Sequence, residues 1–192
     1  MTGEVEKGSQ RLVTPTLRFS LEIVRPLHDV DIKSLKKLNS RALPILYGDD
    51  YWATACDPTK SLYCGFALFK TSSNRLLGSI VLVRDIVELY GIQNMSKKER
   101  TLVQSYGKAA YVSTLMVRPS RQRRGYGTLL VQEACVQMKP YAKMIYLHVD
   151  VSNEKAIAFY AKCGMTRYAR IKNYYFLNDG PQDAYIYMKE LI

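Results

Sequence analysis

The sequence contains few of the residues that bind a metal or cross-link a small protein. Its 192 residues include four cysteines and two histidines, and no two cysteines form a C-x-x-C pair. Because a thiolate zinc site uses closely spaced pairs, we expect no metal centre and four reduced, mostly buried thiols. A chain of this length buries enough surface to fold as one domain without disulfides.

Long hydrophobic runs are also absent. No segment approaches the ~20 consecutive apolar residues that cross a bilayer, and residues 1–20 lack the apolar stretch of a secretory signal. We therefore expect an intracellular protein that does not span a membrane. The apolar fraction of 47% and the charged fraction of 23% exclude a disordered chain.

Acidic residues are scarce compared with basic ones. The chain has 28 Lys and Arg against 17 Asp and Glu, which gives a net charge of +11 with both histidines neutral. This excess favours an anionic partner. Nucleic acid, acidic lipid, the ribosome and a phosphate-rich cofactor all stay open at this point.

The hydropathy pattern divides the chain into a tail and one domain. Residues 1–16 are polar and are predicted to form a flexible tail, and residues 17–192 form the domain. The predicted elements are a strand ending at Pro26, a helix over 30–42, strands over 62–69, 76–83 and 110–117, a helix over 127–138, a strand over 144–150, a helix over 153–163, and strands over 166–171 and 184–188. This order predicts an α/β (α+β) domain with a mixed sheet.

Three local features are less regular. We expect Asp29 or Asp31 to cap the first helix, because a short carboxylate accepts the N–H groups of a first turn. The segment 43–47, Leu-Pro-Ile-Leu-Tyr, is unusually apolar for a loop, and it either packs into the core or forms one wall of a binding groove. The insertion at 86–107 is predicted to contain a short helix whose charges face solvent.

The stretch 121–128, Arg-Gln-Arg-Arg-Gly-Tyr-Gly-Thr, joins a predicted strand to a predicted helix. Gly125 and Gly127 let the backbone approach a ligand closely. The helix that begins there offers unpaired N–H groups and the positive end of its dipole. Four arginines add donors matched to phosphate, namely Arg118, Arg121, Arg123 and Arg124. This stretch therefore predicts a cradle for a diphosphate.

Three other interpretations of the same stretch compete with this one. A P-loop is rejected, because it requires Gly-Lys-Ser/Thr where the sequence has Gly-Thr-Leu. A dinucleotide fingerprint is disfavoured, because Leu130 stands where its third glycine belongs and the basic loop is too long. A solvated basic turn without a ligand stays open.

The motifs resemble those of a known superfamily. Gln122-x-x-Gly125-x-Gly127 after a strand resembles the acetyl-CoA motif of the Gcn5-related N-acetyltransferase (GNAT) superfamily. Residues 149–165 are similar to its second signature, in which Asn-x-x-Ala-x-x-Phe-Tyr lies on a helix beside the cofactor. More specific segments resemble the N-terminal acetyltransferases of the NatE type, namely 43–47, Tyr111, 146–149 and 172–175. The resemblance spans about residues 20 to 190 and implies the GNAT fold, a mostly antiparallel central sheet flanked by helices.

The resemblance assigns two groups of binding residues. It implies that acetyl-CoA contacts Leu115, Met116, Val117, Gln122, Arg123, Arg124, Gly125, Tyr126, Gly127, Thr128, Asn153, Ala156, Phe159, Tyr160 and Lys162. It implies that the peptide substrate contacts Leu43, Pro44, Ile45, Tyr47, Ser113, Tyr174, Tyr175, Phe176 and Leu177. Two departures alter the peptide site, because Leu43 replaces the usual Phe and Ser113 replaces Met.

The resemblance also implies that Tyr111 and His148 form the catalytic pair. An α-amino group has a pKa of ~8 and is mostly protonated at neutral pH, so we expect a base to remove a proton before attack. His148 has an intrinsic pKa suited to that task, and Tyr111 can relay a proton. Strand alternation puts Tyr111 and Ser113 on one face of their strand, and His148 on the same face of its strand as Tyr146 and Asp150. Tyr111 and His148 therefore meet if the sheet brings these two faces together.

These inferences predict an enzyme that transfers acetyl from acetyl-CoA to a protein N-terminal amine by direct attack in a ternary complex, without a metal. The apolar residues 43–45 favour N-termini in which Met precedes a hydrophobic residue. The resemblance implies a cytoplasmic protein whose partners are a peptide substrate, a NatA-type complex and the ribosome, but no sequence-specific nucleic acid and no membrane. Two alternatives stay open: acetylation of lysine ε-amines, and a weakly active or non-catalytic role in such a complex.

Overall fold

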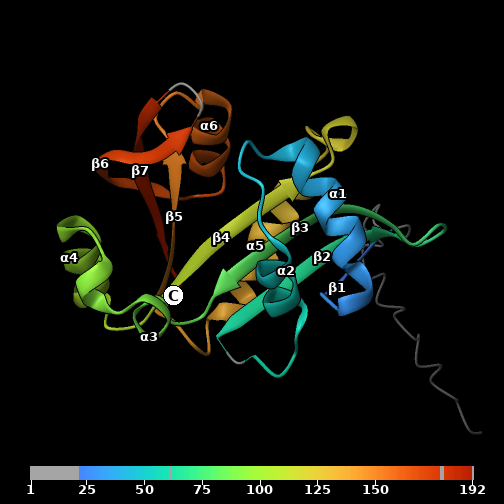
Figure 1. Cartoon of the computed structure of the whole chain (residues 1–192), viewed down its shortest axis with the longest axis horizontal. Helices are drawn as coiled ribbons and strands as arrows, with labels where there is room; N and C mark the ends of the chain where they lie inside the picture. Colours follow the sequence, from blue (N-terminus) through green and yellow to red (C-terminus); the bar gives the residue numbers. More distant parts are fainter. Residues whose placement is uncertain (1–21, 61, 178–179, 192) are drawn as a thin grey trace, which may run out of the picture.

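A seven-stranded sheet runs through the structure (Figure 1). The computed structural model describes residues 22–60, 62–177 and 180–191, and the tail predicted at 1–16 lies outside these. The strands are β1 (Glu22–Pro26), β2 (Tyr63–Lys70), β3 (Arg75–Val83), β4 (Ala109–Val117), β5 (Met144–Asp150), β6 (Thr166–Leu177) and β7 (Gly180–Glu190). Their order is β1-β2-β3-β4-β5-β7-β6, and only β4 and β5 pair in parallel. The predicted mixed, mostly antiparallel sheet is confirmed.

Helices cover both faces of this sheet. The helical segments are η1 (Asp29–Asp31), α1 (Ile32–Ala42), α2 (Asp49–Cys56), α3 (Ile86–Tyr90), η2 (Ile92–Asn94), α4 (Lys97–Tyr106), η3 (Pro119–Arg121), α5 (Tyr126–Met138) and α6 (Glu154–Lys162). On one face, Leu130 of α5 packs in the same cluster as Ile80 of β3. On the other face, Trp52 of α2 packs with Val81. Because Ile80 and Val81 are consecutive in a strand, they point to opposite faces of the sheet.

Two local predictions are corrected by the structure. α2 was not predicted, because its eight residues are too few for a clear apolar period, and it is fixed by tertiary packing of the fully buried Trp52. Asp31 does not cap α1 through its side chain. Its carboxylate accepts the N–H of His28 and pairs with Arg25 instead, so it caps the preceding turn η1.

The strands β4 and β5 diverge soon after they begin. They pair with each other only where Ala109–Tyr111 face Met144–Tyr146. Beyond this point, β4 continues to Val117 beside β3 and β5 continues to Asp150 beside β7, and the two strands no longer pair with each other. The backbone groups on the facing edges therefore lack a strand partner over several residues. Such a gap in a sheet offers backbone N–H and C=O groups to a ligand.

The insertion at 86–107 is more helical than predicted and packs against the C-terminal half of the sheet. It contains α3, η2 and α4, and its Leu102 lies in one buried cluster with Tyr146 and Met188. The prediction that its charges face solvent is wrong for Glu99, which is 8% exposed. In the described part of the chain, no helix has the length and apolar character needed to cross a bilayer.

Candidate active site

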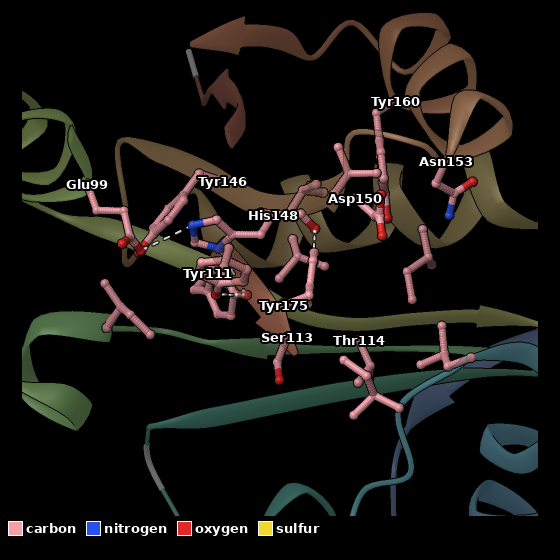
Figure 2. A pocket seen from close by; sticks show the side chains of 18 of the residues that line it. Glu99, Tyr111, Ser113, Thr114, Tyr146, His148, Asp150, Asn153, Tyr160 and Tyr175 are labelled. Atoms are coloured by element: carbon pink, nitrogen blue, oxygen red, sulfur yellow. Dashed lines mark hydrogen bonds and ion pairs between the residues drawn. The ribbon is translucent and has the colours of Figure 1, made fainter. Parts of the chain in front are cut away.

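A cavity of about 540 Å³ opens where β4 and β5 diverge. Its walls come from the loop between α1 and α2, from β4 and β5, from the insertion, and from β6. Figure 2 shows Asn153 and Tyr160 at one end and Glu99 at the other, with Tyr111 and His148 between them. The residues that the sequence assigned to a catalytic pair therefore lie midway along one continuous cavity.

Tyr111 and His148 are brought into contact by the short parallel pairing of their strands. The Tyr111 hydroxyl lies 3.3 Å from Nδ1 of His148 and 3.5 Å from the hydroxyl of Tyr174. The imidazole stacks on the Tyr174 ring with centroids 3.9 Å apart. The Tyr175 hydroxyl donates to the His148 backbone oxygen at 3.1 Å. Tyr174 and Tyr175 of β6 thus pack directly on the pair.

Burial determines the protonation states of this pair. Loss of solvent lowers the pKa of His148 to about 3, so the imidazole is neutral at physiological pH. Burial, with a smaller contribution from neighbouring Tyr174, raises the pKa of Tyr111 well above its usual value, so its hydroxyl keeps its proton. The site therefore holds a neutral proton acceptor next to a hydroxyl that can only donate or relay.

The apolar segment 43–47 forms a wall of the cavity. Leu43, Pro44, Ile45 and Tyr47 all line it, which favours the groove over the core plug. Asn39 of α1 fixes this loop, because its amide nitrogen donates to the Ile45 oxygen at 2.7 Å and its side-chain oxygen accepts from the Tyr47 N–H at 2.9 Å. The sequence pattern did not predict this contact, because a polar residue on a helix is ordinarily assigned to solvent, whereas Asn39 is buried.

Ser113 of β4 contacts the helix α2, which follows the loop 43–47. The Tyr51 hydroxyl donates to Ser113 Oγ at 2.9 Å, so the serine that replaces the family's methionine has a specific partner. Of the C-terminal peptide-binding predictions, Tyr174 and Tyr175 line the cavity. Phe176 does not, because its side chain is 80% exposed. The side chain of Leu177 lies outside the described residues.

The predicted diphosphate cradle has the backbone geometry that an anion site needs. Gly125 is the N-cap of α5 with φ 84°, no side chain caps that helix, and Arg123 has φ 62°. The first N–H groups of α5 are therefore free of side-chain partners at the positive end of a 13-residue helix. At Gly127, an added Cβ would meet the Phe159 ring at 3.0 Å, so glycine permits close packing of α5 against α6. These residues fit a diphosphate.

The other predicted cofactor residues divide by where their side chains lie. Leu115, Asn153 and Tyr160 line the cavity. Asn153 also accepts the Ala156 N–H and so caps α6. Other predicted side chains contact the protein: Met116 packs with α1 and α2, and Val117, Ala156 and Phe159 pack on the core. The side chain of Gln122 donates to the Val117 oxygen. Arg124 and Lys162 are exposed to solvent. The Tyr126 hydroxyl donates to Glu22, so this residue has only its backbone N–H left for a ligand.

No residue of the insertion was predicted as part of a site, yet five of its residues line the cavity: Ile86, Tyr90, Asn94, Met95 and Glu99. Glu99 lies at the end opposite Tyr160 (Figure 2). Among residues 22–60, 62–177 and 180–191, no group of three or more His, Cys, Asp or Glu could hold a metal ion. All four cysteines are free thiols.

The family of this chain follows from a comparison of sequences. The sequence profile of the acetyltransferase (GNAT) family matches residues 32–165. The chain belongs to the acetyltransferase (GNAT) family. The fold and the cradle at the start of α5 agree with this assignment, since both were expected from the GNAT resemblance of the sequence.

Individual proteins are similar to this GNAT chain along most of its length. N-alpha-acetyltransferase 60 of Xenopus tropicalis is 27% identical over 174 residues, which are 86% of this chain and 68% of that protein. The structure of Arabidopsis thaliana NAA60 with a bisubstrate analogue superposes with a TM-score of 0.74 at 20% identity, covering 88% of this chain and 97% of that one. Arabidopsis thaliana Naa50 in complex with the bisubstrate analogue CoA-Ac-MVNAL gives 0.65 at 26% identity, covering 88% and 98%.

Proposed function

We propose that this acetyltransferase moves the acetyl group of acetyl-CoA to the N-terminal α-amine of a protein. The observation that supports this most directly is the Tyr111–His148 contact midway along one cavity. The cradle at Gly125 lies toward the donor side, and the apolar wall 43–47 lies on the acceptor side. The names of the similar N-alpha-acetyltransferases from Xenopus and Arabidopsis point to the same reaction.

The neutral state of His148 determines the order of steps in this proposal. An imidazole with a pKa of about 3 cannot remove a proton from an ammonium of pKa ~8 before attack. The free amine therefore enters neutral and attacks the thioester carbonyl. Once the N–C bond has formed, the nitrogen is cationic and far more acidic, and its proton passes to Nδ1 of His148, through the Tyr111 hydroxyl.

The remaining steps balance the reaction. The C–S bond breaks, and the sulfur leaves with the electron pair as a thiolate, which takes up one proton. His148 releases the proton that it accepted from nitrogen, so the protons balance and the imidazole is neutral again. The negative oxygen of the intermediate needs donors that are already in place. The edge of β4 beyond Tyr111 has no strand partner on the cleft side and can supply backbone N–H groups.

We also propose that the acceptor pocket prefers Met followed by a hydrophobic residue. Leu43, Pro44 and Ile45 present an apolar wall, and burial of an apolar side chain against it contributes about 25 cal/mol per Å². The analogue bound to Arabidopsis Naa50 carries the peptide MVNAL, which begins in this way.

A peptide pair tests the acceptor group. A Met-Leu peptide that contains one internal lysine is expected to be acetylated once, and the same peptide with a blocked N-terminus is expected to give no product. Mass spectrometry of the products locates the acetyl group. Equal turnover of both peptides would show that the lysine is the acceptor and would contradict the proposal.

The pH dependence gives a second test of the same assignment. Neither His148 nor Tyr111 changes its charge in the working range, because the pKa of the first is lowered to about 3 and that of the second is raised well above its usual value. The kcat/KM for the peptide is therefore expected to follow the substrate amine, rising about tenfold per pH unit below about pH 7 and levelling near pH 8. A rise that continues toward pH ~10 would indicate a lysine acceptor.

A further inference from the structure

The insertion places a carboxylate against the catalytic histidine. Glu99 lies in the first turn of α4, and its Oε1 is 3.3 Å from Nε2 of His148 (Figure 2). The Glu99 side chain is 11% exposed and the His148 side chain 1%. Two side chains that water hardly reaches therefore meet at the end of the cavity opposite Tyr160.

The capping geometry of α4 fixes the direction of this carboxylate. Glu99 Oε2 accepts the Ser96 N–H at 3.1 Å, and Ser96 Oγ accepts the Glu99 N–H at 3.2 Å. Since one oxygen is committed to this capping box, the other is free to face the imidazole. The helix itself is held to the hairpin behind the site, because Lys98 Nζ donates to the Arg170 backbone oxygen at 2.8 Å.

The surroundings of His148 leave Glu99 as its acidic neighbour. Nδ1 faces the Tyr111 hydroxyl, and Nε2 is buried without an aligned hydrogen-bond partner. Within the described part of the chain, Glu99 is the one acid with an oxygen within 4 Å of a ring nitrogen of His148. The other titratable groups that pack around it are the phenols of Tyr111, Tyr146 and Tyr174.

We propose that Glu99 is a positioning residue for His148. Its carboxylate keeps the ring proton on Nε2, which leaves the lone pair of Nδ1 directed at the Tyr111 hydroxyl, and it stabilises the imidazolium that forms when Nδ1 takes up the proton of the reacting amine. The insertion thereby completes the proton relay from outside the strands that hold Tyr111 and His148. This inference rests on the proposed acetyl transfer.

The substitution Glu99→Gln tests this role with little change to the helix. Glutamine can still accept the Ser96 N–H, so the capping box is kept. With its oxygen so occupied, the amide turns its NH₂ group toward Nε2, which favours the opposite tautomer. We expect kcat to fall by about tenfold or more, with an unchanged KM for acetyl-CoA.

Two control variants separate positioning from helix stability. Glu88→Gln makes the same chemical change on α3, at an exposed residue, and is expected to match the wild type. Ser96→Ala removes the hydroxyl cap but keeps the backbone N–H of residue 96 that holds Glu99 Oε2. The direction of the carboxylate is therefore kept, so this variant should lower Tm and leave kcat within about twofold. The inference is overturned if Glu99→Gln is as active as Glu88→Gln, or if Ser96→Ala reproduces the loss of kcat.

A second readout does not require activity. The chain has two histidines, and a side-chain ¹H–¹⁵N correlation spectrum, assigned with His148→Phe, reports which nitrogen carries the proton. We expect the wild type to show the proton on Nε2 of His148, and Glu99→Gln to move it toward Nδ1. A wild-type spectrum with the proton on Nδ1 would overturn the inference. If the wild type transfers no acetyl group, the proposed function fails, while this spectrum still decides where Glu99 holds the ring proton.

Discussion

Replacing Tyr111 by Phe is expected to lower kcat by about 100-fold or more, because positioned acid–base groups contribute about 10²- to 10⁴-fold to rates. The substitution removes one hydroxyl, which lies 3.3 Å from His148 Nδ1. It keeps the ring that packs on Tyr146 at 5.1 Å between centroids, so the fold and the KM for acetyl-CoA should hardly change. Steady-state kinetics with both substrates varied measures the two effects separately.

Tyr106→Phe is the matched control for this experiment. It deletes the same atom from a tyrosine whose hydroxyl donates to Glu190, outside the cavity, and its kcat should equal that of the wild type. Turnover that survives in Tyr111→Phe would remove the basis of the proposed proton relay.

The double variant Tyr111→Phe/His148→Phe extends the test to the pair. Residues that act as one unit lose little more together than singly. We therefore expect the kcat of the double variant to lie within a few-fold of the kcat of the slower single variant. Losses that multiply would show that the two side chains act independently.

The sequence predicted the strands and the cradle because these depend on short-range patterns. The exception is the last hairpin, where β6 and β7 extend into the loop predicted between residues 171 and 184. On β4, Tyr111, Ser113 and Leu115 are partly exposed while Ala110 and Val112 are buried, which is the predicted alternation. The φ of 84° at Gly125 likewise follows from a local requirement for glycine at the start of α5. Patterns of this kind are readable because each residue reports on its own neighbourhood.

The contacts that the sequence did not predict join different structural elements. Asn39 of α1 fixes the following loop at Tyr47, and Glu99 meets His148 across 49 positions of the chain. Each of these residues lies on a helix where a polar side chain is ordinarily assigned to solvent. Only the docking of α4 on the sheet shows that Glu99 is buried, and no local period in 86–107 specifies that docking.

The basic loop provides the other large expected effect. Replacing Arg121, Arg123 and Arg124 together by alanine is expected to raise the KM for acetyl-CoA by about 30-fold, which corresponds to the loss of one charge-assisted hydrogen bond of about 2 kcal/mol. Arg123 and Arg124 are exposed and flank a helix start that no side chain caps. Because these groups are expected to bind the donor and not to react, kcat at saturating acetyl-CoA should be preserved.

Charge alone is controlled by a second triple variant. Changing Lys33, Lys37 and Lys139 to alanine removes the same number of positive charges from exposed positions on other parts of the molecule, and its KM should stay within about twofold of the wild type. Added salt should narrow the difference between the arginine variant and the wild type, since screening weakens exposed phosphate contacts. If both variants raise the KM for acetyl-CoA equally, the net charge attracts the donor and the three arginines have no specific part in holding its diphosphate.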